Sequence, residues 1–161
     1  MNNPTTVERT SDLELVVTRT FNGPAHIVFE AWSRPELLQR WWAPKSFGIS
    51  FVSCEADVRT GGTYRFVFSH PAAEQPVAFF GRYIEVTPQS RIVWTNEEGA
   101  DGPISTVTFE EKDGKTLLVL RELYPSKQAL DDAIASGSSG TSGAGEQFEL
   151  LDELLVALAK S

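Results

Sequence analysis

The sequence is poor in cysteine, in basic residues and in long apolar runs. It has one cysteine, Cys54, among 161 residues, so no disulfide can form within the chain. Lys and Arg number 14 against 22 Asp and Glu, which gives a formal net charge of -8. An acidic chain is poorly suited to neutralising phosphates, so we expect neither nucleic acid nor an anionic membrane surface as a partner. No stretch of the sequence approaches the roughly 20 apolar residues of a membrane-spanning helix.

Metal ligands and catalytic motifs are equally scarce. The two histidines, His26 and His70, have no second histidine or cysteine at ligand spacing, so we expect no metal and no other cofactor. There is no Gly-x-Ser-x-Gly elbow, and the Gly-Ser-Ser-Gly run near the C-terminus lacks the lysine of a phosphate-binding loop. Cys54 alternates with apolar residues, where a cysteine usually acts as a small hydrophobe. Catalytic residues therefore stay unknown at this point.

The composition otherwise fits one globular domain. The chain is 41% hydrophobic and 22% charged, which is enough for a core of its own. We place a flexible N-terminus at residues 1–12, because they are polar, and a single domain at 13–161. The single cysteine and the lack of an early apolar run predict a cytoplasmic location.

Residues 13–21 predict a first strand, and two short helices follow it. The apolar residues of 25–32 recur at helical spacing. Ser33 and Glu36 have the spacing of a capping box, so we expect a second helix over 35–42.

From residue 49 onward the apolar period changes to two, which indicates strands. Alternation places three groups on strand faces: Val52, Cys54, Ala56 and Val58; Tyr64, Phe66 and Phe68; and Phe79, Gly81 and Tyr83. Gly81 either leaves space or lets its strand bend. Asp113-Gly114 predicts a tight hairpin. Short, regular turns between six strands favour an antiparallel meander.

Two helical segments end the chain. Ser126 is the expected N-cap of the first one. The second carries an apolar stripe of Phe148, Leu151, Leu154, Leu155 and Leu158. One sheet and one long amphipathic helix must bury each other's apolar faces, and a sheet that curls around a single helix can leave a hollow.

Residues 136–145 consist only of Gly, Ser, Thr and Ala. Glycine in a helix interior is unfavourable by roughly 1 kcal/mol relative to alanine, so this run predicts a loop or a frayed helix start, with Ser142 as a candidate cap. Nothing of domain size follows the run, so it does not link two domains. Sequence alone leaves open whether the run is natural or engineered.

Residues 19–47 resemble the start of the bacterial proteins related to the Activator of Hsp90 ATPase, in the START-like (Bet v 1-like, SRPBCC) superfamily. Further matches follow in order: Arg40-Trp41-Trp42, Gly61-Gly62, Phe79-x-Gly81-x-Tyr83 and the strand end at Trp94. The resemblance covers roughly residues 13–160. It implies an α+β helix-grip fold, with a seven-stranded antiparallel sheet wrapped around a long C-terminal helix and two short helices after the first strand. It also implies a cavity, because superfamily members bind lipids, sterols, hormones or polyketide intermediates, and a minority are enzymes.

The resemblance gives the Gly/Ser run a second meaning. Relatives often carry bulky inward residues around this break, whereas Gly140 and Ala144 stand at those positions here. We therefore expect a cavity that is wider and more open at this rim, and a mobile rim.

The aromatic residues and one charged strand carry the predicted site. Arg121 and Glu122 point to opposite faces of one strand, so one of them faces inward as a candidate ligand anchor. The predicted ligand-binding residues are Trp42, Tyr64, Phe66, Phe68, Phe79, Tyr83, Trp94, Glu122, Gly140, Ala144, Phe148 and Leu151.

Three functions remain open from the sequence. The first is a binding protein for a hydrophobic small molecule. The second is an enzyme of the cyclase, aldolase or hydrolase type in the same cavity, with Glu122 and Arg121 as the first residues to test. The third is an interaction module for Hsp90, which we rank last because the eukaryotic co-chaperone has additional domains. A homodimer is also consistent with a protein of this size.

Overall fold

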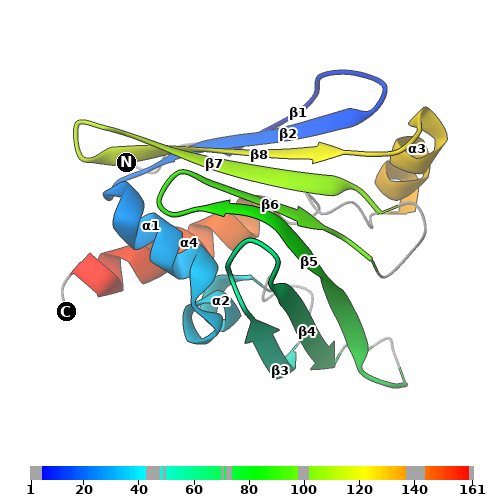
Figure 1. The fold of residues 1–161 in the computed structure, drawn as a ribbon, viewed down its shortest axis with the longest axis horizontal. Coiled ribbons are helices and arrows are strands. Elements are labelled where there is room, and N and C mark those ends of the chain that lie inside the picture. Colours follow the sequence, from blue (N-terminus) through cyan, green and yellow to red (C-terminus); the bar gives the residue numbers. More distant parts are fainter. Residues whose placement is uncertain are drawn as a thin grey trace.

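One antiparallel sheet and four helices make up the described part of the chain (Figure 1). The computed structural model describes residues 5–42, 48, 50–69, 71, 74–97, 102–136 and 144–159. The elements are, in chain order, β1 (Thr6–Arg9), β2 (Glu14–Phe21), α1 (Ala25–Ser33), α2 (Pro35–Trp41), β3 (Ser50–Ala56), β4 (Thr63–Ser69), β5 (Val77–Thr87), β6 (Arg91–Thr95), β7 (Ile104–Lys112), β8 (Lys115–Leu123), α3 (Lys127–Ser136) and α4 (Ala144–Ala159).

The sheet has the order β1-β2-β8-β7-β6-β5-β4-β3, so β3 to β8 form the predicted meander and β2 closes onto β8. It has eight strands in place of the expected seven. The additional strand is β1, which lies within the N-terminus that we expected to be flexible and pairs from Thr6–Thr18 to Arg9–Leu15. All four β1 side chains are exposed. Its pairing therefore depends on backbone hydrogen bonds, which leave no apolar pattern in the sequence.

The junction between α1 and α2 differs from the predicted capping box. Helix α1 includes Ser33, whose Oγ bonds to the carbonyl oxygen of Glu30, and the N-cap of α2 is Arg34. Arg34 has extended backbone angles, and its guanidinium pairs with Glu36. Ser33 cannot cap α2, because it is still part of the preceding helix.

A β-bulge in β3 changes which side chains face inward. Pairing with β4 shifts from Phe51–Phe68 to Ser53–Val67, so Val52 is the extra residue and is 61% exposed. Phe51 and Cys54 face inward on either side of the bulge. The expected grouping of Val52 with Cys54 is wrong, because one inserted residue reverses the alternation.

Two predicted turn and cap features are confirmed. Asp113 and Gly114 both have positive φ, 54° and 77°, as the hairpin between β7 and β8 requires. Ser126 Oγ accepts a hydrogen bond from the backbone N–H of Ala129, which is the N-cap interaction of α3.

Gly81 allows two strands to approach closely. A Cβ at this position would lie 2.2 Å from the carbonyl oxygen of Thr95 on β6. The glycine is therefore required by backbone packing on the β6 side of β5, and it does not open space for a ligand.

The main core lies between the sheet and the helices α1, α2 and α4 (Figure 1). We call the sheet face turned toward these helices the inner face. The expected α4 stripe is confirmed, since Phe148, Leu151, Leu154 and Leu155 are all buried. Helix α3 lies at the opposite end of the sheet from α1 and covers a smaller cluster around Leu130 (Figure 1).

Candidate functional site

A row of inner-face side chains crosses the sheet from β2 to β5. Strand register places Glu122 opposite both Leu15 and Ser105, and Trp94 opposite both Ser105 and Tyr83. Directly opposed residues of antiparallel strands share a sheet face. We call Leu15, Glu122, Ser105, Trp94 and Tyr83 the central row.

A chain of hydrogen bonds leads into this row from β4. Tyr64 OH donates to the carbonyl oxygen of Thr95 at 2.7 Å and lies 3.5 Å from Asn96 Oδ1. Asn96 Nδ2 donates to Pro103 O at 2.8 Å and to Ser105 Oγ at 3.0 Å. Ser105 Oγ in turn donates to Glu122 Oε2 at 3.4 Å. We call Tyr64, Asn96, Ser105 and Glu122 the polar chain.

The polar chain ends on a buried carboxyl group. Glu122 is 3% exposed and Ser105 is fully buried, with Leu120 next along the inner face of β8. Burying a polar group is costly unless hydrogen bonds replace those to water, and the polar chain supplies such bonds. Arg121 points to the outer face and pairs with Glu14 at 3.4 Å. Of the two candidate anchors, Glu122 is therefore the inward one.

Six of the predicted ligand-binding residues belong to one aromatic cluster. Trp42 has its ring centroid 5.3 Å from Phe66, 5.9 Å from Phe68 and 5.4 Å from Phe79. Tyr64 connects this cluster to the central row, at 5.2 Å from Phe66 and 5.6 Å from Tyr83. These are ordinary aromatic contact distances, so the rings stabilise one another. A ligand cavity beside them stays a prediction.

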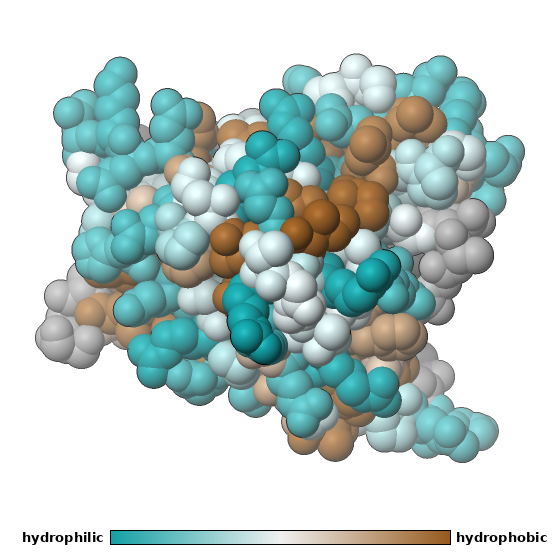
Figure 2. Space-filling model, in the orientation of Figure 1, coloured by the Kyte–Doolittle hydropathy of each residue, from teal (hydrophilic) through white to brown (hydrophobic). Residues whose placement is uncertain are grey.

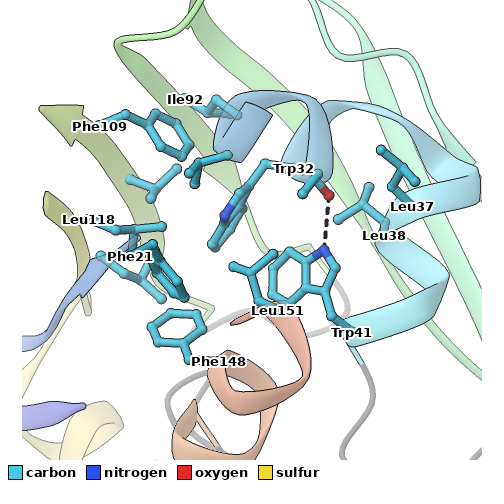
Figure 3. Packing of buried hydrophobic residues seen from close by; sticks show 14 of the residues in the cluster. Phe21, Trp32, Leu37, Leu38, Trp41, Ile92, Phe109, Leu118, Phe148 and Leu151 are labelled. Carbon is cyan, nitrogen blue, oxygen red and sulfur yellow. Dashed lines mark hydrogen bonds between the residues drawn. The ribbon is translucent and has the colours of Figure 1, made fainter. Parts of the chain in front are cut away.

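Phe148 and Leu151 lie deeper than the sequence led us to expect. Both are buried in the core, where Phe148 contacts Phe21 at 5.5 Å and Trp41 at 6.4 Å (Figure 3). Trp41 Nε1 donates to the carbonyl oxygen of Ala31 at 2.9 Å (Figure 3). These contacts give Phe148 and Leu151 a packing role.

The remaining predicted residues belong to the Gly/Ser run. Gly140 and the candidate cap Ser142 lie outside the described residues. Ala144 is the first residue of α4, so α4 begins two residues before the end of the run. The wider, more open rim of the cavity therefore stays a prediction.

Trp32 is a site residue that the sequence analysis missed. Its ring lies 6.0 Å from Trp94 and 6.5 Å from Phe148, within the inner-face core (Figure 3). Its Nε1 is buried and has no hydrogen-bond partner among the described residues. Buried donors without a partner are uncommon in native proteins, so this N–H is a candidate contact for an acceptor atom of a ligand.

Ser105 and Asn96 were also missed. Ser105 is the first inward residue of β7, and the apolar residues Val107 and Phe109 follow it at period two. A small polar residue in such a pattern is the signal that could have identified it. Asn96 has no comparable signal, because its role depends on how β6 ends beside Pro103.

Burial raises the pKa of one thiol and one phenol near the site, those of Cys54 and Tyr83. Burial raises the pKa of Cys54 to about 11, and the charge of Glu36 adds to this effect. Burial also raises the pKa of Tyr83, with smaller contributions from Cys54 and Asp57. A catalytic cysteine requires a lowered pKa, so Cys54 lacks the chemistry of a nucleophile.

A buried arginine on β2 forms ion pairs with α4. Arg19 is inward on β2, and its guanidinium pairs with Asp152 and, at 3.2 Å, with Glu149. The guanidinium carbon lies 5.3 Å from the ring centroid of Phe21. Burial raises the pKa of Asp152 even though Arg19 opposes the shift. The alternation of Val17, Arg19 and Phe21 is a signal that the sequence analysis did not use.

Among the described residues there is no group of three or more His, Cys, Asp or Glu side chains that could hold a metal ion. No helix in the described ranges is long and apolar enough to cross a membrane.

A shallow depression of about 270 Å³ lies at one end of β3 and β4. Its lining residues are Glu55, Ala56, Asp57, Thr63, Tyr64 and Arg65. Tyr64 is thus shared between this depression and the polar chain, whereas the other predicted ligand-binding residues do not line it.

A curved antiparallel sheet, a long C-terminal helix against its inner face and two short helices after β2 together define the helix-grip class of α+β proteins. The family model described as "Activator of Hsp90 ATPase homolog 1-like protein" matches residues 22–156. The chain belongs to this family, as the sequence resemblance implied.

Solved bacterial structures share the fold over nearly the whole chain. A protein from Rhodobacter sphaeroides is 24% identical, with a TM-score of 0.83 over 96% of this chain and 99% of that one. Protein Ms6760 from Mycobacterium smegmatis is 25% identical, with a TM-score of 0.79 over 96% and 99%. Protein NE0264 from Nitrosomonas europaea is 22% identical, with a TM-score of 0.79 over 93% and 98%. No functionally curated protein matches the sequence.

Proposed function

We propose that this protein binds a hydrophobic small molecule on the inner face of the sheet, beside the central row. The observation that carries the proposal is the inward Glu122, which is 3% exposed and bonded to Ser105 within an apolar core. A buried carboxyl group contributes little to folding stability, so its presence is better explained by a role in orienting a ligand.

The surroundings of Glu122 support this proposal. Trp94 is half-buried in the same row, and Tyr83 and Tyr64 stand beside it with their rings in contact. Aromatic walls with a few placed polar groups are typical of small-molecule sites. The family to which the chain belongs has a fold that commonly binds ligands. A cytoplasmic location and a homodimer stay predictions. Phe80, Ile104 and Leu123 leave exposed apolar area on the outer face of the sheet. Figure 2 shows a hydrophobic band between hydrophilic areas on one side of the molecule.

Titration with Nile red, a neutral apolar dye, tests the proposal. We expect saturable binding with enhanced dye fluorescence, and displacement of the dye by other apolar compounds. Trp94→Ala removes an aromatic wall of the site and weakens binding by about tenfold. Arg121→Gln is the control, because Arg121 lies next to Glu122 on β8 but its side chain is on the outer face of the sheet. Absence of saturable binding by the unmodified protein contradicts the proposal.

A second candidate function uses the same residue as a general acid or base. Glu122 is a buried carboxyl group within hydrogen-bond reach of a hydroxyl, an arrangement that proton transfer also requires. In that case Glu122→Gln abolishes turnover of a bound substrate and leaves its dissociation constant nearly unchanged. Arg121 is no longer a candidate partner in the reaction, since its side chain is on the outer face.

Action on Hsp90 remains the third candidate, and we rank it last. The family is described by its relation to an activator of the Hsp90 ATPase. We expect the chain to leave the ATPase rate of a bacterial Hsp90 unchanged at saturating concentration. A reproducible stimulation in that assay overturns this ranking.

A further inference from the structure

The outer face of the sheet is uncovered in the described part of the chain. Helices α1, α2 and α4 pack against the inner face, and α3 packs on Leu15, which also points inward. Strands β2, β8, β7, β6 and β5 lie side by side across the outer face. When helices cover a sheet on one side only, the other side meets solvent or another molecule.

Apolar side chains lie together on the outer face of β7 and β8. Ile104 and Leu123 are directly opposite each other and are 38% and 48% exposed. Leu117 and Val119 occupy further outward positions of β8, and both are only partly buried. Single exposed apolar residues are ordinary on protein surfaces. Neighbouring ones on an uncovered sheet face are a candidate contact surface.

The charges around these apolar residues cancel one another. Three described ion pairs lie on the outer face: Arg121–Glu14, Arg91–Glu85 and Arg82–Glu97. Each pair is neutral, whereas the whole chain carries a net charge of -8. Repulsion between two such acidic molecules opposes their contact through acidic surfaces. The outer face is therefore a surface through which two copies can approach each other without that repulsion.

The size of the outer face fits the contact of a dimer. Strands β7 and β8 are 9 residues long. At about 3.3 Å per residue this length is about 30 Å, and five neighbouring strands at about 4.8 Å spacing span about 24 Å. The resulting area of about 700 Å² is close to the roughly 800 Å² that each partner buries in a stable protein complex.

From the apolar residues, the balanced charges and the area we propose that two copies of this chain associate through the outer faces of their sheets. A two-fold axis between β7 and β8, parallel to both strands, brings Leu123 of each copy over Ile104 of the other. In such a contact the same patch serves both copies. The inner face stays available to a ligand, so this inference does not depend on the proposed binding function.

Sedimentation equilibrium of the full chain over a range of concentrations tests the inference. We expect a reversible equilibrium between one and two copies. Leu123→Asp places an unpaired charge in the contact and should raise the dissociation constant of the dimer by about tenfold or more. Val156→Asp is the matched control, because it adds the same charge at an exposed aliphatic position of α4. It should leave the dissociation constant unchanged.

Cross-linking locates the contact without adding a charge. Cys54 is the single cysteine of the chain, so Cys54→Ser gives a background for one new cysteine at a time. Leu123→Cys is compared with Val156→Cys in this background. A bismaleimide that spans about 10 Å, the usual distance between packed sheets, should join two chains of the Leu123→Cys variant. Chains of the Val156→Cys variant should stay single.

The outcomes are distinct. If the chain remains a single copy at high concentration and Leu123→Cys is not cross-linked, the inference is wrong and the outer face meets solvent or a different molecule. A dimer that persists in Leu123→Asp and is cross-linked through Val156→Cys also overturns it, because the contact then lies on another surface. If Leu123→Asp fails to fold, the cross-linking result decides.

Discussion

At the scale of single residues, Arg19 combines the deepest burial with the most partners of any described cation. Its side chain is fully buried, that of Asp152 is 21% exposed and that of Glu149 is 51% exposed. Breaking such a pair by removing one partner costs more than the pair contributes, because a poorly solvated charge is left behind.

We therefore expect Arg19→Met to lower the free energy of unfolding by about 3 kcal/mol, as measured by urea denaturation. The double variant Arg19→Met/Asp152→Leu should recover most of that loss, since no buried charge is left without a partner. Arg34→Met is the control. It breaks the exposed Arg34–Glu36 pair and should change stability by less than about 0.5 kcal/mol. A double variant as unstable as the single one argues against this explanation.

Cys54 gives a second prediction at this scale. Its pKa of about 11 lies above the ordinary thiol value, because burial disfavours the thiolate. The rate of alkylation by iodoacetamide in the native protein should thus keep rising with pH up to about 11. The same thiol in urea-unfolded protein should level off at the ordinary pKa. Because the folded-state pKa of Cys54 is raised, its ionisation lowers the free energy of unfolding as the pH rises from the ordinary thiol pKa to the raised pKa of about 11. A native reaction that levels off at the ordinary pKa contradicts the assignment.

At the scale of elements, β5 and β6 show how backbone packing limits a strand. A Cβ at residue 81 would lie 2.2 Å from Thr95 O and 2.9 Å from the carbonyl carbon. We expect Gly81→Ala to cost about 2–3 kcal/mol in chemical denaturation, because the backbone of β6 has to shift. Gly23→Ala is the matched control, since a Cβ there has no heavy atom within 4 Å. A Gly81 variant as stable as the control would show that the two strands separate easily.

The elements also show where sequence reasoning succeeded and where it failed. Period-two patterns predicted the inward faces of β4 and β5 correctly, because each strand there has one apolar and one exposed side. The bulge at Val52 was invisible to the same reasoning, since one extra residue reverses the pattern without changing the composition. Strand β1 was missed because all of its side chains are exposed.

At the scale of the whole molecule, the order of elements and the resemblance together predicted the helix-grip architecture. The candidate site was predicted only in part. The sequence left two candidate anchors, Arg121 and Glu122, because they point to opposite faces of one strand. The strand register then places Glu122 on the inner face, opposite Ser105. The polar chain itself joins residues 64, 96, 105 and 122. Contacts between such distant residues follow from strand register, which a single sequence does not specify.

The tryptophans report directly on where a ligand binds. The chain has four of them, so a nitrogen-15 correlation spectrum contains four indole N–H signals. Trp94 belongs to the central row and the ring of Trp32 lies 6.0 Å from it, whereas Trp41 Nε1 is bonded to the carbonyl oxygen of Ala31 (Figure 3). Each indole signal can be assigned by replacing its tryptophan with phenylalanine.

The most direct test of the account is therefore a titration of the labelled protein with naphthol, followed in that spectrum. Binding at the central row predicts saturable shifts of the Trp94 and Trp32 indole signals and of the Ser105 and Glu122 backbone amides. The Trp41 indole and the outward Arg121 amide should shift least. Shifts confined to outer-face residues, or no saturable shift at all, would contradict the claim that this protein binds a ligand between its sheet and its C-terminal helix.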